Sequence, residues 1–100
     1  MRYSKKIHSD AYEIALTGNF TNSSLTSFAK LIDDLKALKP KELIFEMTAL
    51  KSIDSSALGI LLVFREAMLE IGGKVILRNQ NEFISQTLQL GNFDELFDIE

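Results

Sequence analysis

The feature that most constrains the fold is the alternation of short apolar runs with longer segments of helix length. The runs are ELIFEM (Glu42–Met47) and KVILR (Lys74–Arg78). Short, bounded apolar runs are typical of strands that a parallel sheet buries on both faces. The segment between them begins at a capping residue, Asp54 or Ser55, and ends at a glycine pair after Ile71. It is therefore predicted to be a helix that crosses over between two parallel strands.

The rest of the chain extends this plan. Residues 11–17 alternate like a strand that ends at Gly18-Asn19, and residues 2–8 fit an antiparallel edge strand. A first helix is expected from about Ser23 to Leu38, before Pro40, and its N-cap from residues 21–24. Its apolar positions at steps of three and four are Leu25, Phe28, Ile32, Leu35 and Leu38.

The C-terminal third predicts one more helix, Glu82–Leu90, that stops at Gly91-Asn92. Residues 93–99 are expected to add a short last strand or turn. The fold class is therefore α/β: a mostly parallel sheet with an antiparallel N-terminal edge strand, packed by about three helices.

Composition narrows the function. One hundred residues fit a single domain, 1–100. The chain has no cysteine, one histidine and a net charge of −3, which disfavour disulfides, thiolate metal sites and general nucleic-acid binding. No apolar run is long enough for a signal peptide or a bilayer span, so the cytoplasm is the expected location.

The predicted topology points to one edge for recognition. Loops that follow the carboxyl ends of parallel strands gather on the same edge of the sheet. Here these loops are residues 19–22, 48–55 and 79–81. A recognition surface is expected there first.

The most informative stretch, residues 52–62, crosses this edge. It places two hydroxyl residues, Ser55 and Ser56, where a loop becomes a helix. First-turn amides lack helical partners and the dipole there is positive, so a phosphate on Ser55 would be tolerated. That phosphate would add about −1.5 to −2 charge to a docking edge and would switch binding without refolding the domain.

The motif Asp54-Ser55-Ser56-Ala57-Leu58-Gly59 closely resembles the D-S-S-G-L-G signature of STAS domains in the anti-sigma factor antagonist family. The likeness extends along the chain, through Leu16–Gly18 and Ile71–Lys74. Two departures stand out. Ala57 replaces the commoner glycine, and residues 19–22 lack the acidic side chains that many relatives have, which leaves the identity of the partner open.

The resemblance implies a bacterial, cytoplasmic phosphoprotein without cofactor or metal. Ser55 corresponds to the phosphorylated serine, Asp54 to a kinase contact and helix cap, and Ser56 to a supporting neighbour. The implied partner is a serine kinase of the histidine-kinase-like ATPase type that is also an anti-sigma factor, and a PP2C-type phosphatase removes the phosphate. The partner-binding residues are expected to be Asn19, Phe20, Thr21, Asn22, Ser52, Asp54, Ser55 and Ser56. Signal transduction by partner switching in the regulation of transcription is the implied role.

Alternatives remain open at this point. The domain could instead be a constitutive subunit of a lipid ABC transporter or of a stress-signalling scaffold. An enzyme is disfavoured, because neither a serine-hydrolase pattern around His8 nor a Walker loop is present. Phe20 could anchor a partner or fold back against the helix. Gly59 is expected to serve close packing of its helix on the sheet, and Asp33-Asp34 to face solvent.

Overall fold

The computed structural model describes residues 2–21 and 25–100, with side chains in the second range from Phe28 onward. The elements follow in the order β1 (Arg2–His8), β2 (Ala11–Phe20), α1 (Leu25–Leu38), β3 (Glu42–Ile53), α2 (Ser55–Glu70), β4 (Lys74–Arg78), α3 (Glu82–Leu90), a 3-10 turn η2 (Phe93–Glu95) and β5 (Asp98–Ile99). The sheet order is β1-β2-β3-β4-β5. The β1–β2 pair is antiparallel and the other pairs are parallel, so the predicted α/β class is confirmed.

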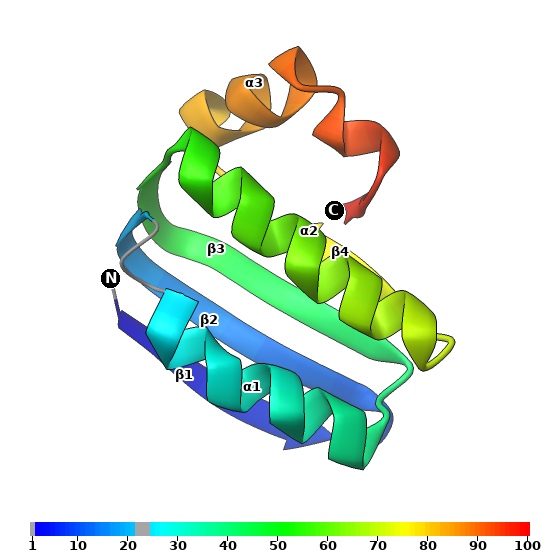
Figure 1. Ribbon diagram of the computed structural model, residues 1–100. Helices are drawn as coiled ribbons and strands as arrows, with labels where there is room; N and C mark the ends of the chain where they lie inside the picture. The colour runs from blue at the N-terminus through cyan, green and yellow to red at the C-terminus, as the bar shows by residue number, and fades with distance from the viewer. Residues whose placement is uncertain (1, 22–24) are drawn as a thin grey trace.

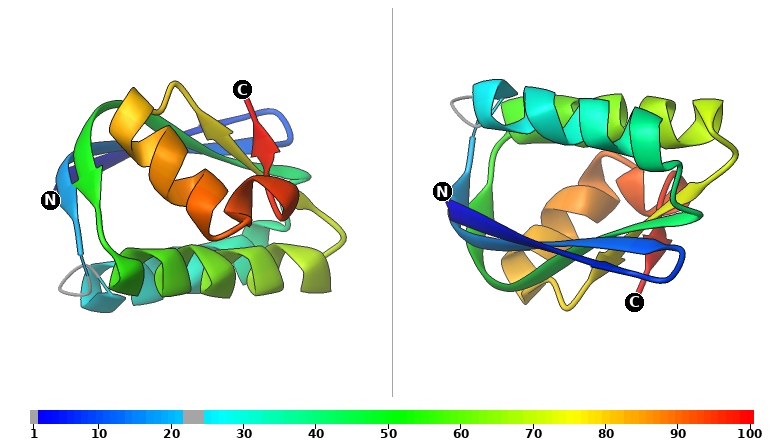
Figure 2. Two further views of the ribbon diagram at one scale, coloured as in Figure 1. Left: turned by 90° about the horizontal axis from the view of Figure 1, so that it is seen from above. Right: turned by 90° about the horizontal axis from the view of Figure 1, so that it is seen from below.

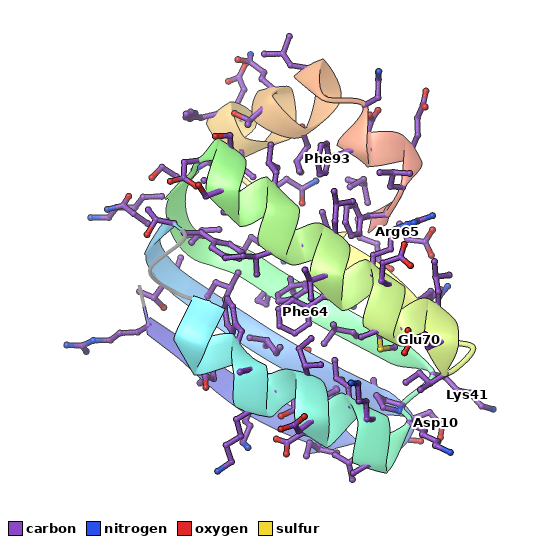
Figure 3. The ribbon with its side chains drawn as sticks, viewed as in Figure 1. Asp10, Lys41, Phe64, Arg65, Glu70 and Phe93 are labelled. Carbon is purple, nitrogen blue, oxygen red and sulfur yellow. The ribbon has the colours of Figure 1, made fainter. Side chains whose placement is uncertain are left out.

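Helices α1 and α2 lie side by side on one face of the sheet, and α3 lies beyond β4 at the margin of the molecule (Figures 1 and 2). Alternate residues of the strands enter the core beneath the two helices. Phe64 of α2 points into this layer (Figure 3) and makes edge-on ring contacts with Phe28 of α1 and Phe45 of β3. The centre of the core therefore joins both helices to the middle of the sheet.

The opposite face of the sheet carries a second, smaller apolar cluster, formed by Ala11, Ile44 and Ile76. Long charged side chains surround it. Lys74 Nζ lies 3.7 Å from a Glu42 carboxylate oxygen, in the row next to Ile44 and Ile76. The methylene stems of such side chains cover apolar surface while their charged ends stay in water, which explains how the cluster is buried without a helix above it.

Strands β2 and β3 are both longer than the sequence predicts. Gly18-Asn19 does not end β2, which continues to Phe20, and the expected loop after residue 47 is strand as far as Ile53. The reason is tertiary: residues 17–20 of β2 pair with residues 49–53 of β3 across two register irregularities. Gly18 adopts a φ of 94°, which glycine reaches without strain, and this allows β2 to continue across the irregularity to Phe20.

The other predicted boundaries agree closely with the structure. β4 and α3 have the predicted limits, and α2 ends at Glu70, two residues before a left-handed glycine, Gly72, with a φ of 78°. The α1 N-cap predicted from residues 21–24 falls mostly on residues 22–24, which lie outside the described residues. One expectation is wrong in part: Asp33 is exposed, but Asp34 accepts hydrogen bonds from the Tyr12 hydroxyl (3.2 Å) and Lys5 Nζ (3.3 Å).

Candidate functional site at the carboxyl edge of the sheet

The junction between β3 and α2 is held by one residue, Asp54. Its carboxylate accepts a hydrogen bond from the Ala57 amide at 2.8 Å, which is the N-cap interaction expected of aspartate. Its own amide donates to the Phe20 carbonyl at 3.2 Å. Because both bonds use Asp54, the start of α2 is fixed to the end of β2 as well as to β3.

Ser55 is the first residue of α2, and its side chain is exposed. Within the described residues no side-chain hydrogen bond engages the Ser55 hydroxyl. Ser56 is exposed as well, whereas the next residue, Ala57, is buried. The helix therefore presents two hydroxyl groups to solvent at its N-terminus and begins to pack against the core only one residue later.

The ends of β2 and β3 meet beside this helix start. Ser52 Oγ donates to Asn19 Oδ1 at 2.6 Å, and the two residues are register partners. Asn19 is exposed, and Thr21 is half-buried. We define the polar edge as Asn19, Thr21, Ser52, Asp54, Ser55 and Ser56. These are the predicted site residues that the fold brings together. Asn22, also predicted, lies outside the described residues.

Phe20 does not belong to this surface. It was expected in a loop, but it is the last residue of β2 and its side chain has 0% exposure. Its ring packs edge-on against Phe28 of α1, with the centroids 5.5 Å apart. Phe20 therefore folds back into the core, and the expectation of an exposed anchor for a partner is wrong. Its contribution to the polar edge is structural, because its buried ring anchors the end of β2 and its carbonyl accepts the Asp54 amide hydrogen bond.

Gly59 also differs from the expectation. It is exposed on α2, and a Cβ atom added there would meet nothing within 4 Å. Close packing of the helix on the sheet therefore does not explain this glycine. A helical glycine costs about 1 kcal/mol relative to alanine. Gly59 lies four residues after Ser55, and no contact within the described part of the domain compensates for this cost.

Asn81, which the sequence places in the loop of residues 79–81 but not among the candidate site residues, also holds this end of the sheet together. Its side-chain oxygen caps α3 by accepting from the Ile84 amide at 2.8 Å. Its Nδ2 donates to the carbonyls of Leu50 (3.2 Å) and Lys51 (3.1 Å) in β3. An asparagine just before a helix is a recognisable N-cap signal, but its second link, to β3, follows only from the fold.

The side chain of Glu46 on β3 also accepts hydrogen bonds near this end of the sheet, from Thr48 and Asn79. Burial acts to raise the pKa of Glu46, but hydrogen bonds from Thr48 and Asn79 and the nearby charge of Arg78 outweigh it and lower that pKa. Asn79 Nδ2 lies 3.1 Å from Glu46 Oε1. The ionised carboxylate therefore ties the β4–α3 loop to β3.

The described residues give little support for catalysis. His8 is the last residue of β1 and pairs with Ala11 at the start of β2, the end of that strand away from Ser55. Its Nε2 is 3.9 Å from a Glu13 carboxylate oxygen. The length of β2, roughly 30 Å at ~3.3 Å per residue, separates it from the Ser55 end. No group of three or more His, Cys, Asp or Glu side chains among the described residues is placed to hold a metal ion. Likewise, no helix that the structure describes is long and apolar enough to cross a membrane.

Comparison with known proteins decides the family. The family model described as the STAS domain matches residues 2–100. The chain belongs to the STAS family. No curated protein sequence matches this STAS domain closely enough to count as a relative.

Solved structures show the same fold. The anti-sigma factor antagonist SpoIIAA in its unphosphorylated form superposes with a TM-score of 0.87 at 17% identity, over 99% of this STAS domain and 88% of that chain. The phosphorylated form of SpoIIAA, described as a Bacillus cell fate determinant, gives 0.75 at 16% identity, over 99% and 91%. A putative anti-sigma factor antagonist from Thermotoga maritima gives 0.81 at 24% identity, over 97% and 84%. This STAS domain is thus similar in fold to anti-sigma factor antagonists.

Proposed function

We propose that this STAS domain is a non-enzymatic protein-binding switch controlled by phosphorylation of Ser55. The unphosphorylated domain binds a serine kinase that is also an anti-sigma factor, or another regulator of that type, and phosphorylation weakens binding. A PP2C-type phosphatase restores the binding form. The observation that carries the proposal is the exposed Ser55 hydroxyl at the first position of α2, within the polar edge.

The electrostatics of the polar edge support a switch of this kind. Asp54 already places a carboxylate beside Ser55 and occupies the Ala57 amide. A phosphate on Ser55 adds about −1.5 to −2 charge next to that carboxylate. A partner surface that fits the neutral hydroxyl and the single Asp54 charge then meets roughly three negative charges. Burying this added charge in a closely fitted interface without a matching opposite charge is costly, so binding is weakened without any change of fold.

The exposed Gly59 supports the same surface. Gly59 lowers the stability of the helix and fills no tight space within the domain. Because it has no side chain, a second protein can approach the α2 backbone closely at this point. A partner that contacts Ser55 and follows the helix axis passes over Gly59 one turn later. We therefore include the first two turns of α2 in the docking surface.

Binding by Ser55 variants tests the proposal. The wild type, Ser55→Ala and Ser55→Glu, each tagged at the same site, are expressed in the native cells, and captured proteins are identified and quantified by mass spectrometry. Ser55→Ala is expected to retain a serine kinase or related regulator, and Ser55→Glu to retain at least about tenfold less, a difference of about 1.4 kcal/mol in binding free energy. Ser4→Glu on the exposed strand β1 is the matched control, since it adds the same charge away from the polar edge.

Two results would count against the switch. Equal capture by Ser55→Ala and Ser55→Glu favours a constitutive subunit, especially if the captured protein is a transporter or a scaffold. Loss of binding in Ser4→Glu as well would mean that net charge, and not the position of the charge, controls the interaction. Purified variants that unfold at the wild-type temperature ensure that binding alone is compared.

A further inference from the structure

Asn19, near the end of β2, holds its side-chain amide in one orientation. Ser52 Oγ lies 2.6 Å from Asn19 Oδ1. This distance is typical of an O–H···O hydrogen bond and is shorter than the usual range for N–H···O, so the hydroxyl donates and the amide oxygen accepts. The two residues are register partners on neighbouring parallel strands, which keeps their side chains adjacent. The pairing of β2 with β3 therefore fixes which end of the amide faces Ser52.

The other end of the same amide is a hydrogen-bond donor that faces away from Ser52. Asn19 Nδ2 carries two hydrogens, and no hydrogen bond to another described residue engages them. The Asn19 side chain is exposed, whereas Ser52 is half-buried. Because Ser52 engages the oxygen, the group that Asn19 offers to the outside is a pair of N–H donors.

These donors lie beside the helix start that carries Ser55. Asn19 precedes Phe20, whose carbonyl accepts the hydrogen bond from the Asp54 amide. Asp54 in turn precedes Ser55, the first residue of α2. Asp54 is also the only residue of the polar edge with an ionisable side chain. The polar edge therefore offers two recognition groups of opposite kind, an anionic acceptor at Asp54 and an oriented neutral donor at Asn19.

We propose that Asn19 determines which partner the polar edge accepts, by donating a hydrogen bond from Nδ2 to an acceptor oxygen of that partner. Ser52 is the positioning residue that orients the amide for this contact. The inference rests on the proposed function, because the partner is the regulator that contacts Ser55. It adds the polarity of the partner surface, which carries an acceptor opposite Asn19 and a donor opposite Asp54. A regulator with a donor opposite Asn19 is rejected, since donors on both sides are then left unpaired.

A role in folding alone explains the Asn19–Ser52 pair less well. Its hydrogen bond is exposed, and water can replace either partner of such a bond with little loss of stability. Strands β2 and β3 are already paired from Ala11 with Glu42 to Phe20 with Ile53. Substitutions at this pair should therefore change binding more than they change the stability of the fold.

Titration calorimetry of the full chain tests the inference, with the purified regulator that the wild type captures from its own cells. Asn19→Ala removes the donor and is expected to raise the dissociation constant at least about fivefold. Asn19→Asp is similar in shape but replaces the donor with a charged acceptor, so an increase of at least about 30-fold is expected. Thr17→Asp is the matched control, because it adds the same charge at an exposed position of β2 outside the polar edge.

Ser52 variants test the orientation of the amide. Ser52→Ala is expected to raise the dissociation constant about threefold, and Ser52→Thr, which keeps a hydroxyl group, to bind like the wild type. In the Asn19→Ala background, Ser52→Ala is expected to have no further effect, because the hydroxyl acts only through the amide. A further loss of binding in that double variant would overturn the positioning role. Urea unfolding confirms that each variant is folded.

The outcomes separate this inference from the switch. If Ser55→Glu weakens binding while both Asn19 variants bind like the wild type, the switch stands and the role of Asn19 is overturned. Weakening by Asn19→Asp without weakening by Asn19→Ala would also overturn it, because the added charge and not the lost donor would then be responsible. Equal weakening by Thr17→Asp and Asn19→Asp leads to the same conclusion. If Ser55→Glu binds as tightly as the wild type, the switch itself fails, whatever the Asn19 variants show.

Discussion

The two ends of helix α2 are built in opposite ways. At the C-terminal end, Gly73 lies against the turn that leads into β3, and an added Cβ would be 2.5 Å from Met68 Cε and 3.0 Å from the carbonyl oxygens of Pro40 and Lys41. At the N-terminal end, Gly59 has open space around it, and Ser55 and Ser56 face solvent. The C-terminal end is packed closely against the rest of the chain, whereas the N-terminal end, whose backbone Asp54 anchors, leaves its exposed side chains open to contacts outside the chain.

The surroundings of the two ends agree with this difference. Asp10, Lys41 and Glu70 gather where α2 ends (Figure 3), and the Lys41 amide donates to the Asp10 carbonyl at 2.8 Å. At the other end, Asp54 connects the helix start to the strands through its amide and carboxylate. A change at the packed C-terminal end should therefore affect stability, whereas a change at the exposed hydroxyl residues Ser55 and Ser56 should affect mainly binding.

The largest effect on stability is expected from Gly73→Ala. The Met68 methyl can move aside, but the two backbone carbonyls at 3.0 Å cannot move without disturbing the turn. Overpacking of this kind costs about 1–3 kcal/mol, measured as the free energy of unfolding in urea. Gly72→Ala gives a contrasting cost, because Gly72 has a φ of 78° with open space around it, whereas Gly73 has close contacts but no positive φ. If Gly73→Ala is no less stable than the wild type, the packed end is described wrongly.

Asp54→Ala should have the next largest effect. It removes the N-cap bond to Ala57 and is expected to lower the free energy of unfolding by about 1 kcal/mol. An asparagine side chain can still cap the helix, so Asp54→Asn should keep most of the stability while removing the charge at the polar edge. Thermal unfolding of the two variants separates the capping role from the charge. Equal losses in both would show that the cap contributes little.

Gly59→Ala is expected to act in the opposite direction. Alanine removes the glycine penalty without a clash and should raise the free energy of unfolding by up to about 1 kcal/mol. The same methyl group should weaken capture of the partner, because it projects from α2 into the proposed docking surface one turn after Ser55. A variant that is more stable and binds as well as the wild type would remove Gly59 from the docking surface.

The smallest effect concerns pH and Glu46. Its pKa is lowered in the folded chain, so its ionised form stabilises the fold above the unfolded-state pKa, about 4.3, and that contribution is lost as the pH falls through the folded pKa. Glu46→Gln should therefore be slightly less stable than the wild type near pH 6. The difference should shrink toward pH 3. Urea unfolding across this range measures it, and a difference independent of pH would contradict the assigned cause.

The sequence was sufficient for the order of the elements and for the start of α2. Asp54 before a hydroxyl pair is a local capping pattern, so local chemistry identified it. The length of β2 and β3 was not visible, because Gly18 and residues 48–53 read locally as turn and loop, and only their pairing with each other makes them strands. Pairing between segments far apart in the chain cannot be recognised from a short local stretch of sequence.

The two site residues that were misjudged fail for the same reason. Phe20 next to Asn19 reads as part of a polar loop, and only the extension of β2 turns its ring toward Phe28. Gly59 reads as a packing glycine because glycines in helices often allow a close approach. Which side of α2 meets the core is decided by the whole sheet, and that side holds Ala57 and Ile60 instead.

The most direct test of the switch is the intact mass of the protein isolated from its own cells, with fragmentation to locate any phosphate. The account predicts a population heavier by one phosphate, with the group on Ser55, and its complete loss in Ser55→Ala. Protein that carries no phosphate under any growth condition, or carries it on another residue while Ser55 stays unmodified, would contradict the account.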